Sequence, residues 1–222
     1  MHLLAWLPNF NFNNQRMKKT KSLHLFLTPL LLGLFSFIEL EGVESIEERI
    51  KKLKLPEAIT SFGACRDNNF LYVYGGHVGE AHVYSKKTHS KSFVRINLDE
   101  PDQWEHLPFN QPLQGFGMAA HKGKIFIAGG SQATNEEDSE SNLSSLSEVS
   151  YFDVKSKMWK KSTPLPKPRS SHEMVVHNDK LYVLGGWQME NGKGVTWPNY
   201  GLVGKITKKG IKWKKLPKTK WT

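Results

Sequence analysis

The chain has 222 residues, a single cysteine at Cys65 and a formal net charge of +10. This length accommodates one or two domains, and one cysteine excludes an internal disulfide framework and a zinc site built from four cysteines. The positive charge belongs to the two ends: residues 1–22 carry four basic side chains, residues 204–222 carry eight, and neither stretch has an acid, which leaves residues 23–203 at −2. No basic stripe with interleaved aromatics runs through the middle, so we expect no nucleic-acid partner.

The first feature along the chain is a short basic stretch followed by an apolar run, Leu23–Ile38. This layout is typical of a secretory signal peptide, and the run falls short of the ~20 residues that span a bilayer. Residues 17–41 are therefore predicted to be a signal peptide or, because no small-x-small cleavage triplet follows, an uncleaved membrane anchor. Residues 1–16 are a doubtful N-terminal extension. We expect an exported protein that is periplasmic, at the cell surface or extracellular.

A short linker helix is predicted for residues 42–54. Val43, Ile46, Ile50 and Leu53 recur at spacings of three and four, which is the period of one helix face. Glutamates stand four residues before lysines at two places in the same stretch, a spacing that supports a helix. We assign this segment a connecting role.

The rest of the chain repeats one unit three times. Each unit has a two-residue turn, an apolar strand, a Gly-Gly pair, a tryptophan 28 to 30 residues after the pair and then Leu-Pro. Five features in constant phase, repeated three times, are the signature of a repeat architecture. The repeated residues are Gly75, Gly76 and Trp104 in the first unit, Gly129, Gly130 and Trp159 in the second, and Gly185, Gly186 and Trp213 in the third.

The repeated strands are apolar on both of their faces, in the strings LYVY, IFIA and LYVL. Such strands must be covered on both sides, because a face open to water would alternate with polar residues. Sheets that pack face to face around an axis meet this demand. The Gly-Gly pairs allow positive φ or a close approach of another backbone. The tryptophans are large enough to fill the wedge between neighbouring sheets.

This combination resembles the kelch repeat: Gly-Gly, an aromatic pair such as Tyr151-Phe152, and a tryptophan seven or eight residues later. Pro168–His172 also fits the usual kelch lead-in to a strand, whereas Thr60–Gly63 and Gln114–Gly117 lack its arginine and histidine. The chain looks most similar to exported bacterial kelch proteins of the galactose-oxidase-like superfamily. The resemblance covers about residues 55–217. It implies an all-β fold. Residues 55–222 would form a β-propeller segment with about three four-stranded blades, at roughly 55–108, 109–166 and 167–217.

Three blades are too few to close a ring, since propellers contain four to eight. We therefore expect an incomplete ring whose terminal blades expose apolar faces and strand edges. The favoured explanation is that the sequence is part of a longer propeller. The alternative is self-association, in which two copies pair through their open blade faces into a six-bladed ring.

Long segments follow the glycine pairs at 77–92, 131–148 and 187–201, and their constant phase places all three on one side of the propeller. Aromatic residues on a loop rim suit stacking on sugars or peptides, and the alternative is that they pack the loops onto the blades. We expect no metal site and no cofactor, because neither the histidines nor the acidic residues of these segments have ligand spacing. The candidate ligand-binding residues are His77, His82, Trp187, Trp197 and Tyr200.

Two functions follow as hypotheses. The first is an exported, non-catalytic binding module that presents loops on one propeller face to a protein or a glycan. The second rests on the resemblance alone and is a periplasmic sugar mutarotase or epimerase similar to the kelch sialic-acid mutarotases. For that activity, Arg169, His172 and Glu173 form the local cluster that offers an arginine for a carboxylate and groups for acid–base chemistry. We favour the non-enzyme, with a membrane contact only through an uncleaved N-terminal anchor.

Overall fold

The computed structural model describes residues 45, 48, 51, 53–190 and 193–218. The chain divides into two units, residues 1–43 and 44–222, and all described residues belong to the second unit. The predicted extension and the predicted signal peptide or anchor therefore lie outside the described residues. In the described part of the chain, no helix has the length and apolar character needed to cross a membrane. Within the predicted linker helix, Ser45 and Glu48 exchange the hydrogen bonds of a capping box, and Glu48 and Lys51 are helical.

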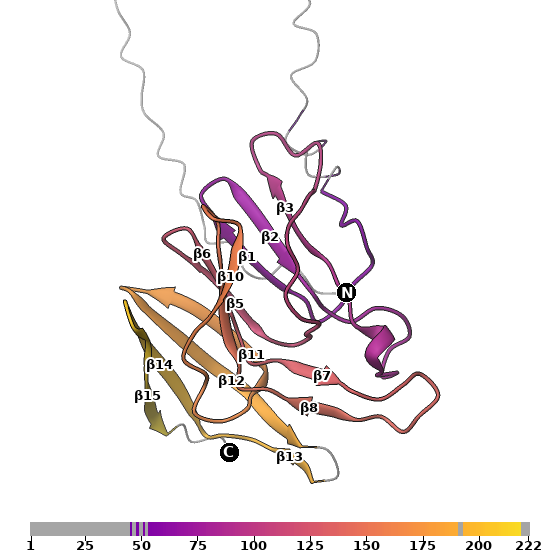
Figure 1. The fold of residues 1–222 in the computed structure, drawn as a ribbon, viewed down its shortest axis with the longest axis vertical. Helices are drawn as coiled ribbons and strands as arrows, with labels where there is room; N and C mark the ends of the chain where they lie inside the picture. Colours follow the sequence, from indigo (N-terminus) through magenta and orange to yellow (C-terminus); the bar gives the residue numbers. More distant parts are fainter. Residues whose placement is uncertain (1–44, 46–47, 49–50, 52, 191–192, 219–222) are drawn as a thin grey trace, which may run out of the picture. The chain divides into compact units, whose positions relative to one another are not determined.

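Three antiparallel sheets follow one another along the chain, which confirms the predicted all-β fold with four-stranded blades (Figure 1). The first blade has the order β1-β2-β3-β4, with β1 (Gly63–Asp67), β2 (Phe70–Tyr74), β3 (Phe93–Asn97) and β4 (Glu105–His106). The second has the order β5-β6-β9-β10, with β5 (Gly117–His121), β6 (Lys124–Ala128), β9 (Val149–Asp153) and β10 (Met158–Lys161). The third has the order β11-β12-β14-β15, with β11 (Ser170–His177), β12 (Lys180–Glu190), β14 (Tyr200–Thr207) and β15 (Gly210–Lys218).

Short elements occupy the segments after the glycine pairs. The first segment contains a 3-10 helix, η1 (Lys86–Thr88), which Ser85 and Thr88 cap. The second contains a two-stranded hairpin of β7 (Ser131–Ala133) and β8 (Leu143–Ser145). In the third, β12 extends beyond its glycine pair and pairs with β13 (Gly194–Thr196).

The two-residue turns before the repeated strands have a positive φ at their first residue in all three blades, and at their second residue in the second and third blades. Asn68, Lys122 and Asn178 have φ angles of 52°, 49° and 47°, and Gly123 and Asp179 follow with 70° and 57°. A tight hairpin between right-twisted strands requires such positive φ angles. These turns set the register of the first two strands in every blade.

The blades pack on one another through apolar clusters, as the two-sided strands predict. Between the first and second blades, Trp159 contacts the rings of Tyr74, Phe93 and Phe152 at 5.4 to 5.5 Å between centroids. Between the second and third blades, Trp213 packs beside a cluster that includes Phe126, Leu181, Val183 and Leu202. Trp159 and Trp213 therefore both lie at a junction between blades.

Each repeated tryptophan also bonds to the backbone at or within two residues of the Leu-Pro pair that precedes its blade. The indole N–H of Trp104 donates to the carbonyl of Lys54 at 2.8 Å, and that of Trp159 to the carbonyl of Pro108 at 2.6 Å. Trp213 makes the equivalent bond to the carbonyl of Thr163 at 3.1 Å. A repeated hydrogen bond of this kind explains why the tryptophan keeps its phase with the preceding Leu-Pro.

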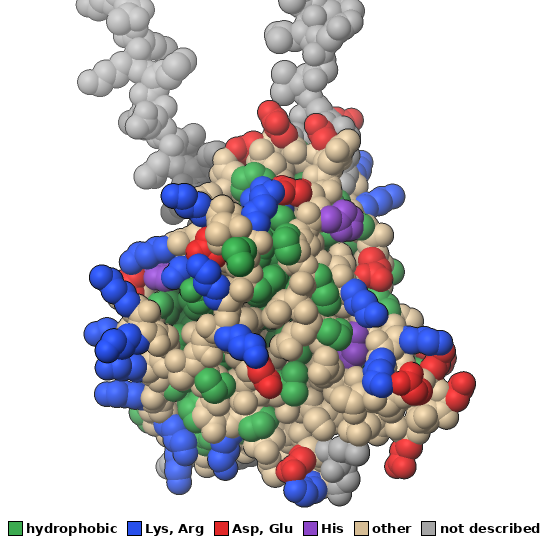
Figure 2. Space-filling model, in the orientation of Figure 1, with side chains coloured by type: hydrophobic (Ala, Val, Ile, Leu, Met, Phe, Trp, Pro, Cys, Tyr) green, Lys and Arg blue, Asp and Glu red, His purple; other side chains and the backbone are tan. Residues whose placement is uncertain are grey.

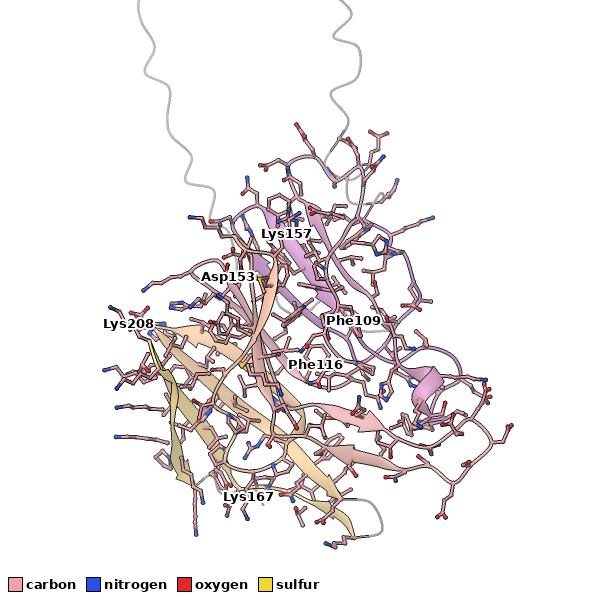
Figure 3. The ribbon with its side chains drawn as sticks, viewed as in Figure 1. Phe109, Phe116, Asp153, Lys157, Lys167 and Lys208 are labelled. Carbon is pink, nitrogen blue, oxygen red and sulfur yellow. The ribbon has the colours of Figure 1, made fainter. Side chains whose placement is uncertain are left out.

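The lead-ins form a second periodic contact close to the inner strands. Ser61, Gly115 and Ser171 all have positive φ angles, between 52° and 58°. The N–H of Gly115 donates to the carbonyl of Ser61 at 2.8 Å, and the N–H of Ser171 donates to the carbonyl of Gly115 at 2.6 Å. One backbone hydrogen bond thus connects each blade to the next, in addition to side-chain packing. Phe109 and Phe116 lie in the lead-in of the second blade, where both contact the ring of Tyr74 (Figure 3).

The outer faces of the first and third blades differ in how they are covered. On the first blade, Val73 and Val94 are 3% and 2% exposed and lie against the lead-in residues Leu55, Pro56 and Ile59. On the third blade, Val175 and Leu184 are 52% and 48% exposed. The apolar face of the third blade is therefore uncovered among the described residues.

Candidate functional site

The three segments after the glycine pairs contact one another in sequence order, as expected from their constant phase. The N–H of Lys86 in the first segment donates to the carbonyl of Asn135 in the second at 3.0 Å. The N–H of Met189 in the third donates to the hydroxyl of Ser145 in the second at 2.9 Å. Ion pairs of Lys86 with Glu136 and of Lys87 with Glu137 add to the first of these junctions. The segments therefore form one continuous loop face.

The histidines proposed for ligand binding both have their rings near one tyrosine, Tyr84. His77 is buried, its Nε2 lies 2.9 Å from the carbonyl of Glu80, and its ring packs edge-on against Tyr84 at 5.3 Å. His82 is exposed and its ring lies 6.5 Å from Tyr84. Within the described residues, no group of three or more His, Cys, Asp or Glu side chains is placed to hold a metal ion.

His89 is a buried residue of the first segment that the sequence does not mark as a candidate. Its Nε2 accepts a hydrogen bond from the N–H of Ala133 at 2.8 Å, so it joins the first segment to the second. Burial, and secondarily the nearby His77, lowers the pKa of His89 from 6.5 to about 4. A lone histidine in a stretch without hydrophobic periodicity gives no signal for this role.

The three aromatic residues predicted for the third segment lie around one groove. Trp187 comes from β12, and Trp197 and Tyr200 come from the return to β14. The groove has a volume of about 780 Å³, and its other lining residues include Leu184 and the Gly185-Gly186 pair. Trp197 is 71% exposed, so its indole face is open to a ligand. Neither His77 nor His82 lines this groove, and Leu184 is a lining residue that the sequence analysis missed.

Arg169 is buried and binds the backbone of two residues that line the groove. It is 2% exposed, and its guanidinium donates to the carbonyls of Gly185 at 3.0 Å and Tyr200 at 3.1 Å. Its guanidinium also lies 5.3 Å from the centre of the Tyr200 ring. The Nζ of Lys215 lies 4.4 Å from the same ring centre. Burial lowers the pKa of Arg169 from its usual value. Arg169 therefore positions Gly185 and Tyr200.

The three residues considered for acid–base chemistry do not converge. His172 is 5% exposed and lies beside Gly117 and Gly129 of the second blade. Glu173 is the next residue of β11, so it faces the opposite side of the sheet and is exposed. Arg169 is bound to backbone carbonyls, His172 is buried against the second blade, and Glu173 lies on the opposite face, so the three side chains do not face one common site as the mutarotase hypothesis requires.

We expect the stability of the protein to depend on pH through two of its buried histidines, His89 and His172. Burial, and secondarily the charge of Arg169, lowers the pKa of His172 to about 4, as burial does for His89. Because the folded state binds these protons less readily than the unfolded state, the free energy of unfolding is highest above pH 6.5 and falls as the pH decreases toward 4. Urea unfolding at about pH 7 and about pH 5 measures this effect, because most carboxylates are ionised at both values.

The matched variants are His89→Gln with His172→Gln, and the exposed His106→Gln as the control. The double variant is expected to show a smaller difference in the free energy of unfolding between the two pH values, and the control the same difference as the original chain. Equal differences in all three proteins contradict the assignment.

The glycine pairs of the three blades differ in what covers them. A Cβ at Gly75 would lie 2.7 Å from the carbonyl oxygen of Leu113, and one at Gly129 would lie 2.3 Å from the carbonyl oxygen of Arg169. Both oxygens belong to the lead-in of the next blade. A Cβ at Gly185 has nothing within 4 Å. The groove beside Gly185 is thus the position that a lead-in backbone fills in the first two blades.

Comparisons with known proteins agree with this architecture. The family model described as the KLHDC2/KLHL20/DRC7 Kelch-repeats domain matches residues 43–202. The chain is 26% identical over 145 residues to beta-scruin of Limulus polyphemus, covering 64% of this chain and 15% of that protein. It is 30% identical over 136 residues to Kelch-like protein 40 of Xenopus laevis, covering 60% of this chain and 19% of that protein. It is 33% identical over 134 residues to Kelch-like protein 41b of Danio rerio, covering 60% of this chain and 20% of that protein. The chain thus spans a fifth or less of the length of these relatives. The solved structure of YjhT has a TM-score of 0.58 at 11% identity, covering 72% of this chain and 47% of that one, and shows a likeness of fold.

Proposed function

Because this chain belongs to the Kelch-repeat family, we propose that it is a protein-interaction module whose loop face binds an extended segment of a partner protein in the groove beside Gly185. The observation that carries the proposal is the aromatic rim of this groove, where Trp197 is 71% exposed and Trp187 and Tyr200 are further lining residues. Repeat folds commonly use a face built from such insertions for recognition. An exposed apolar groove on a folded domain is a typical place for a partner to bind.

The occupants of the equivalent positions in this chain indicate what fits the groove. In the first blade the segment that starts at Leu107-Pro108 places the carbonyl of Leu113 2.8 Å from the N–H of Gly76. In the second blade the segment that starts at Leu165-Pro166 places the carbonyl of Arg169 2.8 Å from the N–H of Gly130. The groove itself adds an apolar rim of Leu184, Trp187, Trp197, Pro198 and Tyr200. These contacts favour an extended segment that carries leucine and proline.

The test uses a synthetic peptide with the sequence of residues 105–116 and the tryptophan fluorescence of the full chain. We expect a saturable change in fluorescence that is weakened about tenfold or more by Gly185→Val, because the added side chain fills the groove. Met158→Ala, at an exposed site on the second blade, is the control and leaves binding unchanged. Binding that Gly185→Val does not affect would falsify the placement.

A glycan is the second candidate ligand for the same groove. The exposed indole face of Trp197 favours it, because aromatic faces on a rim stack on sugar rings. Titration of the same protein with neutral oligosaccharides distinguishes the two: a glycan site responds to the sugars and loses the response in Trp197→Ala. The mutarotase alternative has less support, since Arg169 is buried and its guanidinium binds carbonyls. Anomer exchange of N-acetylneuraminate, followed by NMR, is expected to proceed at the uncatalysed rate.

We further propose that residues 17–41 export the protein and that its uncovered third blade allows self-association. The basic stretch and apolar run support the first proposal, and recovery of the chain from a periplasmic or extracellular fraction tests it. The exposed side chains Val175 and Leu184 support the second. Sedimentation of the purified chain tests that proposal, and a monomer at all concentrations contradicts it.

A further inference from the structure

A basic groove lies between the second and third blades, on the side of the molecule that carries the two-residue turns. Both of its walls belong to blades that the structure describes, and its volume is about 540 Å³. None of its described lining residues is acidic, and four of them are lysines: Lys124, Lys161, Lys208 and Lys209. We call this space the lysine groove.

Two local departures from the repeat build the lysine groove. The tryptophan stands three residues before Leu-Pro in the first and third repeats but six residues before it in the second, so residues 162–164 are an insertion. The β14–β15 hairpin, aligned on its tryptophan, continues for two cross-strand pairs beyond the β9–β10 hairpin. The insertion and the longer hairpin meet where the N–H of Ile211 donates to the hydroxyl of Thr163 at 3.0 Å. Gly210 leaves room for this hydroxyl, because a Cβ there would collide with it.

The four lysines come from both walls of the groove. Lys124 begins β6 and Lys161 ends β10, both in the second blade. Lys208 and Lys209 form the turn between β14 and β15 in the third blade. Lysines gather on the surface over this turn, where Lys208 is labelled (Figures 2 and 3). The groove thus brings basic side chains of two blades together.

Two acids stand on neighbouring elements, and neither lines the groove. Asp153 pairs with Lys124 across β6 and β9, but its carboxylate lies 3.7 Å from the Nζ of Lys160 and accepts the N–H of Ser156 at 3.0 Å. Asp179 lies 2.6 Å from the Nζ of Lys122. None of the ion pairs among the described residues includes a lysine of the groove. Its positive charge is therefore not compensated by this part of the chain.

The junction between the first and second blades shows how the same position is neutralised elsewhere. There Glu105, the residue after the repeated tryptophan, lies 2.6 Å from the Nη2 of Arg95 and 2.9 Å from the Nζ of Lys157. One carboxylate thus joins a cation of the first blade to a cation of the second. In the second blade the residue after the tryptophan is Lys160. The second junction has a further cation where the first has its carboxylate, and such a cluster in a hollow concentrates anions.

We propose that the lysine groove binds a small molecule that carries two or more phosphate groups. Its volume falls within the range of about 300–1,000 Å³ that is usual for sites of small ligands. Lysine binds phosphate well because its ammonium group is a compact point charge. A phosphate monoester carries about −1.5 to −2 charges at pH 7, so two such groups balance the four ammonium groups. The hydroxyl of Ser162, another lining residue, offers a neutral donor beside them.

The experiment measures binding of inorganic triphosphate to the full chain by isothermal titration calorimetry, with inorganic phosphate as the matched probe. We expect one triphosphate per chain, bound at least tenfold more tightly than phosphate, with an affinity that falls as salt is added. Triphosphate is also expected to raise the unfolding temperature, because it binds the folded state.

The variant that tests the site is Lys161→Gln with Lys208→Gln, which removes one lysine from each wall. We expect it to bind triphosphate at least tenfold more weakly. The control is Lys91→Gln with Lys167→Gln, which removes the same charge from exposed residues outside the groove and leaves the affinity unchanged. Gly185→Val also leaves triphosphate binding unchanged, so this site and the groove beside Gly185 succeed or fail separately.

Other results overturn the proposal. The absence of saturable binding, or an equal loss of affinity in both double variants, shows that the groove does not select the anion. Equal affinity for phosphate and triphosphate contradicts a site for several phosphate groups. Tighter, groove-dependent binding of duplex DNA or of a phosphorylated peptide contradicts a site for a small molecule. Groove-dependent binding of vesicles that contain phosphatidylinositol bisphosphate supports the site and identifies a lipid headgroup as the source of its phosphates.

Discussion

Replacement of Trp159 by alanine is expected to lower the free energy of unfolding by about 3 kcal/mol. The indole packs against Tyr74, Phe93 and Phe152 at the junction of the first two blades. Its N–H donates to the carbonyl of Pro108, which loses this partner in the variant. The value lies at the low end for an aromatic truncation because the side chain is partly buried. Urea unfolding followed by circular dichroism measures the loss.

The matched control for this prediction is Trp197→Ala. Trp197 is 71% exposed, so its removal is expected to change the free energy of unfolding by less than about 0.5 kcal/mol. Trp213→Ala is expected to lower the free energy of unfolding by a similar amount. The native Trp213 packs at the second junction, and its N–H donates to the carbonyl of Thr163, so the variant loses both contacts. A small effect at Trp159 contradicts its role as the packing residue between blades.

Gly129→Ala is expected to destabilise the protein by about 3 kcal/mol or more. The residue has a φ of 61°, which costs an L-residue roughly 1–2 kcal/mol. The new Cβ would also lie 2.3 Å from the carbonyl oxygen of Arg169, a backbone atom that moves only with the lead-in of the third blade. Overpacking of this kind adds about 1–3 kcal/mol.

Gly185→Ala separates the backbone cost from the steric cost. Gly185 occupies the place of Gly129 in the third repeat and has a φ of 73°, but nothing lies within 4 Å of a Cβ added there. We therefore expect a loss of only about 1–2 kcal/mol, from backbone strain alone. Equal losses in the two variants contradict the view that the position beside Gly185 is open. Thermal or urea unfolding of both proteins under one condition decides the matter.

Much of the fold can be predicted from short-range features of the sequence. The turn residues, the two-sided apolar strands and the phase of each tryptophan are enough to define the three blades. The site is predictable only in part. The aromatic residues of the third segment line one groove, as expected for a binding rim, whereas His77 and His82 lie apart from it.

The remaining features depend on residues that are distant in the chain. The lysines of the last repeat are conspicuous in the sequence, but the groove that Lys208 and Lys209 share with Lys124 follows from the packing of the third blade on the second. The hydrogen bond of His89 comes from Ala133, 44 residues later. Neither contact leaves a periodic signal, because each occurs in one repeat only.

Local sequence patterns specify the repeat, its turns and the residues that pack between blades, because these depend on backbone preference and on a pattern that recurs three times. Which faces are covered is settled by the packing of the blades. Gly75, Gly129 and Gly185 are equivalent in sequence, yet backbone covers the first two and leaves the third open. Coverage is supplied by a neighbouring blade about 54 residues away, so it cannot be read from the repeat alone.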